Sequence, residues 1–136
     1  MAAFTMTRAV SAPYDDVVDR VRDELAAVGF GVLTEIDLAA TMRNKVGEEI
    51  PPTLILGACR PQLAHRAFTA DARVAALLPC NVVISAQGGD VASTVIEVMD
   101  PTVMPGLTET AELAPVAAEA AELLGRMLDA VSGAGV

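Results

Sequence analysis

The sequence is poor in aromatic residues, with no Trp, one Tyr and three Phe among 136 residues. Platforms that stack the bases of single-stranded nucleic acid are built from such side chains, so they are missing here. Basic residues are also few, because nine Lys and Arg stand against 18 Asp and Glu, for a net charge of −9. A chain of this sign repels phosphate backbones and anionic lipid. We therefore expect neither nucleic acid nor a membrane surface among its partners.

Several familiar signatures are absent as well. The sequence contains no G-x-G-x-x-G, no G-x-x-x-x-G-K-[ST] and no G-x-S-x-G, so nucleotide-driven and serine-hydrolase functions have no support. No apolar stretch approaches the roughly 20 residues that span a bilayer, and no basic start leads into an apolar run. With only two Cys, a structural disulfide is not expected, because chains without an export signal stay in a reducing compartment. These features predict a cytoplasmic protein.

The composition is that of a folded domain. Hydrophobic residues make up 53% of the chain and the mean hydropathy is +0.48, which excludes disorder of the charged, apolar-poor kind. The length fits one domain over residues 1–136, and no internal linker or repeat interrupts it. The pattern of apolar residues predicts the element order βαβαβαββα. We expect an α+β two-layer sandwich, with a mixed or antiparallel sheet and helices mainly on one face.

The clearest element is a first helix over about 13–28, with an apolar stripe at helical spacing. Gly29 ends it, and Phe30 is placed to fold back on Leu25 as in a Schellman cap. The other expected strands cover 2–10, 31–38 (half-buried), 54–59 (buried on both faces), and 80–86 and 91–98, the last two joined by a Gly-rich hairpin. The other expected helices are a short one over 39–46, one from Pro61 to about Thr69, a short one over 72–78, and an acidic last helix over about 110–132. Residues 100–106 are expected to form a loop.

Two segments carry the residues with most chemical potential. Cys59 ends a predicted strand just before a helix that Pro61 starts, and Cys80 begins a later strand just after Pro79. If the two strands are antiparallel neighbours, the end of one lies beside the start of the other. The two sulfurs then share one end of the sheet, and His65 lies on the helix between them.

The position of Cys59 before a helix predicts a lowered thiol pKa, because the free N–H groups of a helix start carry positive charge and Arg60 adds to it. Three soft or borderline ligands, Cys59, Cys80 and His65, are able to hold Cu(I) or Zn²⁺, although this spacing matches no recognised metal motif. The alternative is that both Cys residues are core side chains and that His65 is an exposed helix residue next to Arg66.

The two Cys-containing segments resemble a widespread prokaryotic family catalogued as domain of unknown function 302. The likeness covers about residues 8–101 and rests on Lys45–Gly47, Ile55–His65, Leu77–Val83, the Val28–Val32 turn and Asp100–Pro101. The resemblance implies a small α+β fold, usually a homodimer, with two cysteine segments as its hallmark and no settled activity. Members commonly carry Asn where this chain has Arg60, and an aromatic residue near Thr53, so the helix-capping role of that Asn is absent here.

Three hypotheses follow for the function. The first is a homodimeric binding protein that holds a soft metal or a small thiol-reactive ligand at Cys59, Cys80 and His65, with Arg60 beside them. The second is a thiol-based redox or sulfur-handling enzyme, in which one Cys attacks and the other resolves. The third is a structural dimer with core cysteines. The sequence does not decide whether the chain is an enzyme and gives more support to binding. It indicates no particular cofactor, substrate or ligand.

Overall fold

The computed structural model describes residues 3–87 and 90–133. Its strands are β1 (Thr5–Val10), β2 (Gly31–Asp37), β3 (Thr53–Cys59), β4 (Cys80–Gln87) and β5 (Asp90–Met99). Its helices are α1 (Tyr14–Ala27), α2 (Leu38–Val46), α3 (Pro61–Ala70), α4 (Met104–Thr108) and α5 (Ala114–Gly133), with 3-10 turns η1 (Ala72–Leu77), η2 (Pro101–Val103) and η3 (Ala111–Leu113). The Gly88-Gly89 connection that predicted the hairpin lies outside the described residues.

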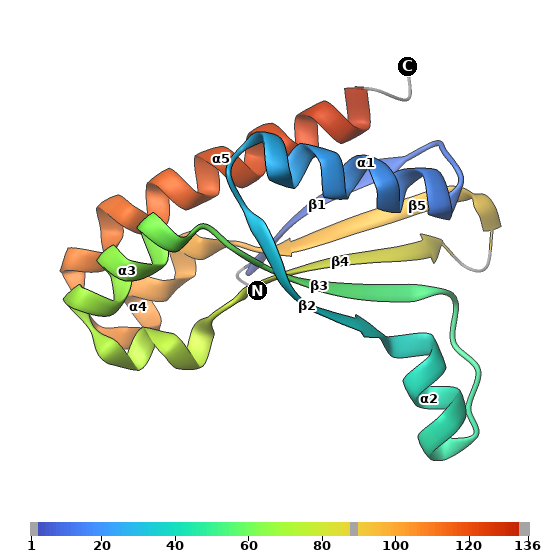
Figure 1. Cartoon of the computed structure of the whole chain (residues 1–136), viewed down its shortest axis with the longest axis horizontal. Coiled ribbons are helices and arrows are strands. Elements are labelled where there is room, and N and C mark those ends of the chain that lie inside the picture. Colours follow the sequence, from blue (N-terminus) through green and yellow to red (C-terminus); the bar gives the residue numbers. More distant parts are fainter. Residues whose placement is uncertain (1–2, 88–89, 134–136) are drawn as a thin grey trace.

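The five strands form one sheet in the order β1-β5-β4-β3-β2, and every neighbouring pair is antiparallel. Helices α1 and α5 lie side by side across one face of this sheet, as Figure 1 shows. α3 and α4 stand at one end of the sheet, and α2 projects from the other end (Figure 1). The predicted fold class, α+β with an antiparallel sheet and helices, is confirmed, and the element order differs by the added short helix α4.

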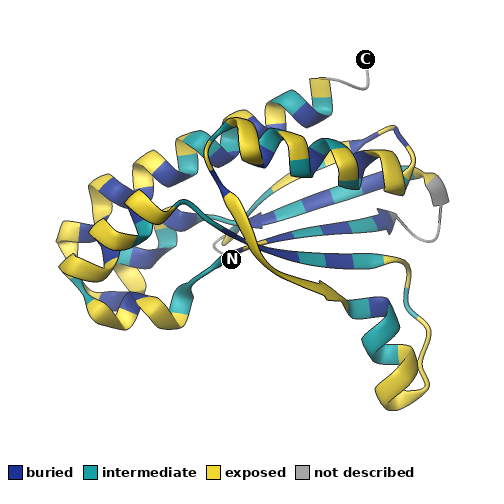
Figure 2. Ribbon diagram, in the orientation of Figure 1, coloured by how far each residue is buried: buried dark blue, intermediate teal, exposed yellow. Residues whose placement is uncertain are grey.

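The core lies between the sheet and the pair α1 and α5. Along β3 and β4 the side chains alternate, so that Leu56 and Val82 are fully buried while Ile55 and Val83 on the opposite face are only half-buried. Figure 2 shows this alternation along the strands, and shows buried residues on the inner sides of α1 and α5. The apolar side of α5 and of η3 before it is buried, at Leu113, Ala117, Ala120, Leu124, Met127, Leu128 and Val131. No helix in the described part of the chain is long and apolar enough to cross a membrane.

The first helix ends as its sequence predicts. Gly29 has a φ of +83°, which a residue without a Cβ adopts at little cost. The Phe30 N–H donates to the Leu25 carbonyl at 2.9 Å, and the Gly29 N–H donates to the Ala26 carbonyl at 3.0 Å. Phe30 and Leu25 are both buried, which completes a Schellman cap. This cap sets the direction in which the chain enters β2 and places Phe30 at the end of the sheet.

The structure corrects three local expectations. β2 is exposed along its whole length rather than half-buried, because it is the edge strand of a sheet whose covering helices lie over the other strands. β3 is buried at Leu54, Leu56 and Ala58 on its inner face, but on the opposite face only Gly57 is buried, since that face of the antiparallel sheet is open. The expected loop over 100–106 instead forms η2 and the start of α4, where Asp100 accepts a hydrogen bond from the Thr102 N–H and caps the turn.

Candidate functional site

The two cysteines lie at the same end of neighbouring strands. In the β3–β4 ladder Ala58 is the direct partner of Cys80, and Cys59 follows Ala58 as the last residue of β3. The inference that the end of one strand lies beside the start of the other is thereby confirmed. Cys80 is 5% exposed and Cys59 is half-buried. Both thiols are free, so this end of the sheet carries two unpaired sulfurs.

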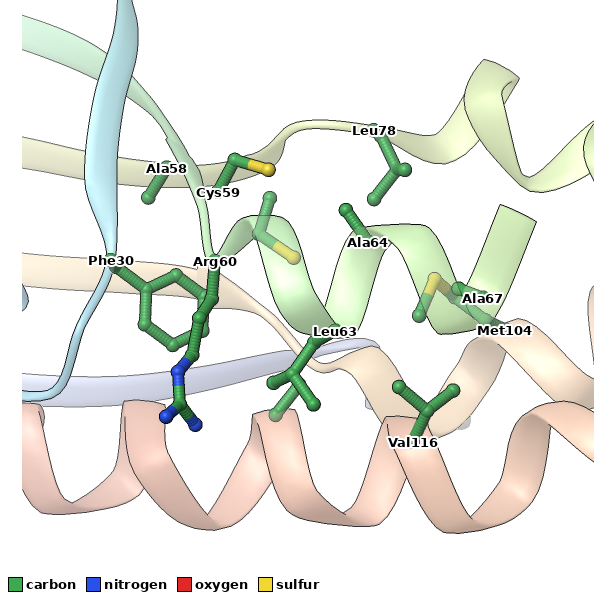
Figure 3. Close-up of a pocket in the computed structure, with 12 residues that line it drawn as sticks. Phe30, Ala58, Cys59, Arg60, Leu63, Ala64, Ala67, Leu78, Met104 and Val116 are labelled. Carbon is green, nitrogen blue, oxygen red and sulfur yellow. The ribbon is translucent and has the colours of Figure 1, made fainter. Parts of the chain in front are cut away.

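Cys59 and Cys80 open onto one apolar pocket, which we call the thiol pocket. Strand ends, α3 and α5 supply its walls, and its lining residues are Phe30, Ala58, Cys59, Arg60, Leu63, Ala64, Ala67, Leu78, Cys80, Met104, Val116 and Ala120. In Figure 3 the Cys59 sulfur points toward the space bounded by Ala64 and Leu78. The pocket has a volume of only about 30 Å³, and one buried water already requires roughly 10–15 Å³. The pocket therefore has room for only a few atoms.

Arg60 is the single charged residue among those that line the thiol pocket. It precedes α3 without capping it, because its side chain makes no hydrogen bond to the helix, and Pro61 occupies the first helical position where a missing N–H costs nothing. Its side chain runs past the Phe30 ring toward α5 (Figure 3), where its Nη1 lies 4.0 Å from Glu119 Oε1. Arg60 therefore covers the rim of the pocket and leaves the interior apolar.

His65 is not part of this site. It is exposed on α3 and lines a separate open groove of about 420 Å³ with Arg66, Thr69, Glu112, Pro115 and Val116. The structure therefore does not bring His65 together with Cys59 and Cys80, as the metal set expected from the sequence requires. The described residues contain no group of three or more His, Cys, Asp and Glu side chains that could hold a metal ion. Zn²⁺ usually takes four protein or water ligands, so the two thiols alone do not support a zinc site.

Both thiols have raised pKa values, whereas the sequence predicted a lowered pKa for Cys59. Burial raises the pKa of the Cys59 thiol. Burial, and then the charge of a Cys59 thiolate, raise the pKa of the Cys80 thiol to about 11. Desolvation raises the thiol pKa values by more than the positive charge of the α3 N-terminus and of Arg60 lowers them. The Arg60 guanidinium extends toward α5 and away from the sulfurs. Both sulfurs are therefore protonated near neutral pH, which removes the main argument for a thiolate nucleophile.

This shift predicts how stability depends on pH. The unfolded chain loses the Cys80 proton near pH 9, whereas the folded chain keeps it to about 11, so unfolding releases a proton between these values. The free energy of unfolding should therefore fall by about 3 kcal/mol as pH rises through this window. Urea titrations at several pH values compare the native chain with Cys80→Ala. If the free energy of unfolding depended on pH in the same way in both proteins, the prediction would be contradicted.

A cluster of polar side chains around Asp71 fixes the C-terminal end of α3. The Asp71 carboxylate accepts hydrogen bonds from the Arg73 N–H at 3.0 Å, from Arg73 Nη2 at 2.7 Å and from Thr110 Oγ1 at 2.7 Å. The Arg73 side chain also donates to the Thr108 carbonyl at 2.7 Å. The hydrogen bonds from Arg73 and Thr110 hold the pKa of Asp71 far below its usual range. This cluster ties the end of α3 to the segment between α4 and η3.

Sequence reasoning missed most of the pocket wall. Leu63 and Ala67 on α3, and Val116 and Ala120 on α5, are each spaced by four residues and so lie on one helix face. That spacing was visible in the sequence and indicates two apolar faces. It does not indicate that these faces meet at the strand ends that carry the cysteines. Met104 begins the five-residue helix α4 and Leu78 lies in the connection before β4, and both segments are too short to show a periodic signal.

Comparisons with known proteins agree with this arrangement. A family model described as "Domain of unknown function DUF302" matches residues 6–131, which corrects the extent of about 8–101 expected from the resemblance and takes in most of α5. A crystal structure of an uncharacterized conserved protein DUF302 from Bacillus stearothermophilus is similar with a TM-score of 0.87 and 29% identity, over 96% of this chain and 99% of that chain. No curated protein matches the chain.

Proposed function

The chain belongs to the DUF302 family, and we propose that it binds a soft, thiol-seeking small ligand between Cys59 and Cys80. The observation that carries this proposal is the placement of two free thiols from neighbouring strands on one apolar pocket. Thiol and thiolate sulfurs are the protein ligands that soft metal ions and other soft electrophiles prefer. The apolar wall favours a ligand whose remaining part is small and uncharged.

The alternative of a redox or sulfur-handling enzyme has less support. Such an enzyme requires a thiolate at working pH, and burial raises the pKa of both thiols. A ligand that binds by displacing the thiol protons does not need a preformed thiolate, since the sulfur–ligand bond itself offsets the cost of deprotonation. The raised pKa values are thus compatible with binding and unfavourable for nucleophilic turnover.

Phenylarsine oxide is the probe that tests this proposal. It is apolar and condenses with two neighbouring thiols, forming two As–S bonds and releasing one water without any change of oxidation state. We expect one equivalent to bind the native chain and binding to weaken at least 100-fold in Cys59→Ser and in Cys80→Ser, because each variant leaves one sulfur. Calorimetry with intact-mass measurement gives affinity and stoichiometry.

The control for this experiment is Ser93→Cys in the Cys59→Ser background, which restores the number of thiols at a position on β5, outside the thiol pocket. This variant should bind as weakly as Cys59→Ser. Equal binding by the native chain and by either single-cysteine variant would refute a shared thiol site and would leave the cysteines as core residues.

We also propose that the partner of the chain is a second copy of itself, which covers the outer side of β2. Leu33 is 64% exposed and Ile36 is 46% exposed on this edge strand. On the open face of the sheet, Ile36 lies beside its ladder partner Ile55, which in turn lies beside Val83, so the three form one apolar row. Exposed apolar edge strands of this length are usually covered in solution.

The distribution of charge supports self-association at this surface. The row of Ile36, Ile55 and Val83 is uncharged in a chain of net charge −9, and eight of its 18 acidic residues lie on α1 and α5 in the other layer. On β2 itself, Glu35 forms an ion pair with Arg22. The next residue of this row, the Val83 partner Glu97, is charged, so the proposed contact is centred on β2 and leaves Glu97 at its margin. A two-fold axis makes one patch complementary to itself.

A further inference from the structure

The volume of the thiol pocket raises the question of how any ligand reaches the sulfurs. Ligand sites typically enclose about 300–1,000 Å³, whereas this pocket measures about 30 Å³. Cys80, which lines it, is 5% exposed. An organic or chelated ligand therefore enters only if one wall moves. The sheet cannot be that wall, because Cys80 and Ala58 are held in the β3–β4 ladder.

Of the two longer helices that wall the pocket, α3 is held by fewer buried side chains than α5. Only Leu63 and Ala67 of its ten residues are buried, whereas seven residues of α5 are buried. Segments with few buried apolar contacts open locally at lower free energy than the rest of a fold. Three residues of α3 line the pocket, and two of them are alanines. A small outward shift of α3 therefore enlarges the pocket without dismantling the core.

Ion pairs to one carboxylate hold α3 against α5. The Arg66 Nη1 lies 2.7 Å from Glu119 Oε2, and the Arg60 Nη1 lies 4.0 Å from Glu119 Oε1. Glu119 is thus approached by two cations, one on α3 and one directly before it, and its neighbour Ala120 on α5 lines the pocket. At its far end α3 is fixed by the Asp71 cluster described above. Between Arg60 and the Asp71 cluster, α3 is held by the buried side chains of Leu63 and Ala67 and by the Arg66–Glu119 ion pair.

We propose that α3 is a movable cover of the thiol pocket and that Glu119 holds it closed. Loss of the Glu119 carboxylate, or screening of its ion pairs by salt, shifts the population toward an open form in which both thiols are accessible. The movement of α3 controls access to the ligand site proposed between Cys59 and Cys80, and its functional role rests on that proposal. Its motion is measured without any ligand, so the two proposals can fail separately.

The test is the rate at which N-ethylmaleimide alkylates Cys80 in the folded protein. In the Cys59→Ser background one thiol is followed, and the reaction forms one S–C bond while the thiol proton passes to the maleimide carbon. Glu119→Gln should accelerate alkylation about threefold to tenfold, the effect of losing one or two exposed ion pairs. Raising NaCl from about 0.05 to about 0.5 M should accelerate alkylation of the protein that retains Glu119 and leave the rate of the Glu119→Gln variant nearly unchanged.

Glu122→Gln is the matched control, because Glu122 pairs with Arg126 inside α5 and makes no ion pair to α3 in the described part of the chain. It should alkylate at the rate of its Cys59→Ser parent. The free energy of unfolding of each variant is measured in urea in parallel. Equal rates for Glu119→Gln and Glu122→Gln, or an acceleration no larger than the loss of global stability explains, would overturn the proposal. Failure of phenylarsine oxide to bind, with the alkylation rates as expected, would instead overturn only the binding function.

Discussion

Gly57→Ala should lower the free energy of unfolding by about 3 kcal/mol, the largest change in stability that we expect from adding a single methyl group. Gly57 is buried in β3 on the open face of the sheet, opposite Thr34 of β2. A Cβ at this position would overlap the Thr34 Oγ1 and would lie 2.7 Å from the Pro79 Cγ. The proline ring cannot rotate away, and Pro79 directly precedes Cys80, so the strain reaches the thiol pocket.

Gly125→Ala is the matched control for Gly57→Ala. Gly125 lies inside α5, and a Cβ there would meet nothing within 4 Å, so this variant should gain about 0.5–1 kcal/mol from helix propensity. Thr34→Ala in the Gly57→Ala background should recover part of the loss, since it removes one of the two overlapping atoms. Urea unfolding measures all three variants. A loss at Gly57 below about 0.5 kcal/mol would show that the strand ends are less tightly packed than the structure has them.

Ile36→Lys should raise the dissociation constant of the proposed dimer at least 100-fold. A lysine on β2 places two like charges near the two-fold axis and removes an apolar side chain from the row with Ile55 and Val83. Because Ile36 is 46% exposed in the single chain, the change should leave the fold intact. Sedimentation velocity at micromolar concentration distinguishes the two states, and circular dichroism verifies the fold.

Phe4→Lys provides the comparison for Ile36→Lys. Phe4 is 67% exposed and precedes β1 at the opposite edge of the sheet, so the variant makes the same apolar-to-basic change away from the proposed interface. It should remain as dimeric as the native chain. A native chain that sediments as a monomer, or a dimer that is unaffected by lysine at position 36, would refute association through β2.

The parts of the fold that the sequence predicted well depend on local chemistry. The cap at Gly29 and Phe30 defines the end of α1 because the required φ and the apolar contact both involve residues a few positions apart. The placement of Cys59 and Cys80 followed from two strand ends and a connection of helical length, and the antiparallel register confirmed it. In each case the decisive interactions join near neighbours or adjacent strands.

The parts that the sequence did not predict depend on which elements cover which. Alternation in β2 is the same whether a helix lies over the strand or not, so the strand was expected to be half-buried, whereas Leu33 and Ile36 are exposed. The raised thiol pKa values have a similar cause. A helix start and an adjacent arginine are visible in the sequence, whereas the apolar walls contributed by Met104, Val116 and Ala120 come from distant segments. Desolvation by those walls determines the direction in which the thiol pKa values shift.

The order of the strands has a consequence for how the chain acquires this structure as it is synthesised. β1 pairs with β5, so that Thr5 lies opposite Met99, and the first strand leaves the ribosome long before its partner exists. At about 5–20 residues per second, the interval is on the order of 5 to 20 seconds. α5, which brings Val116 and Ala120 to the thiol pocket, is translated later still. Until that helix docks, both thiols stand open to oxidants and electrophiles, so the nascent chain is the form of this protein most vulnerable to covalent damage.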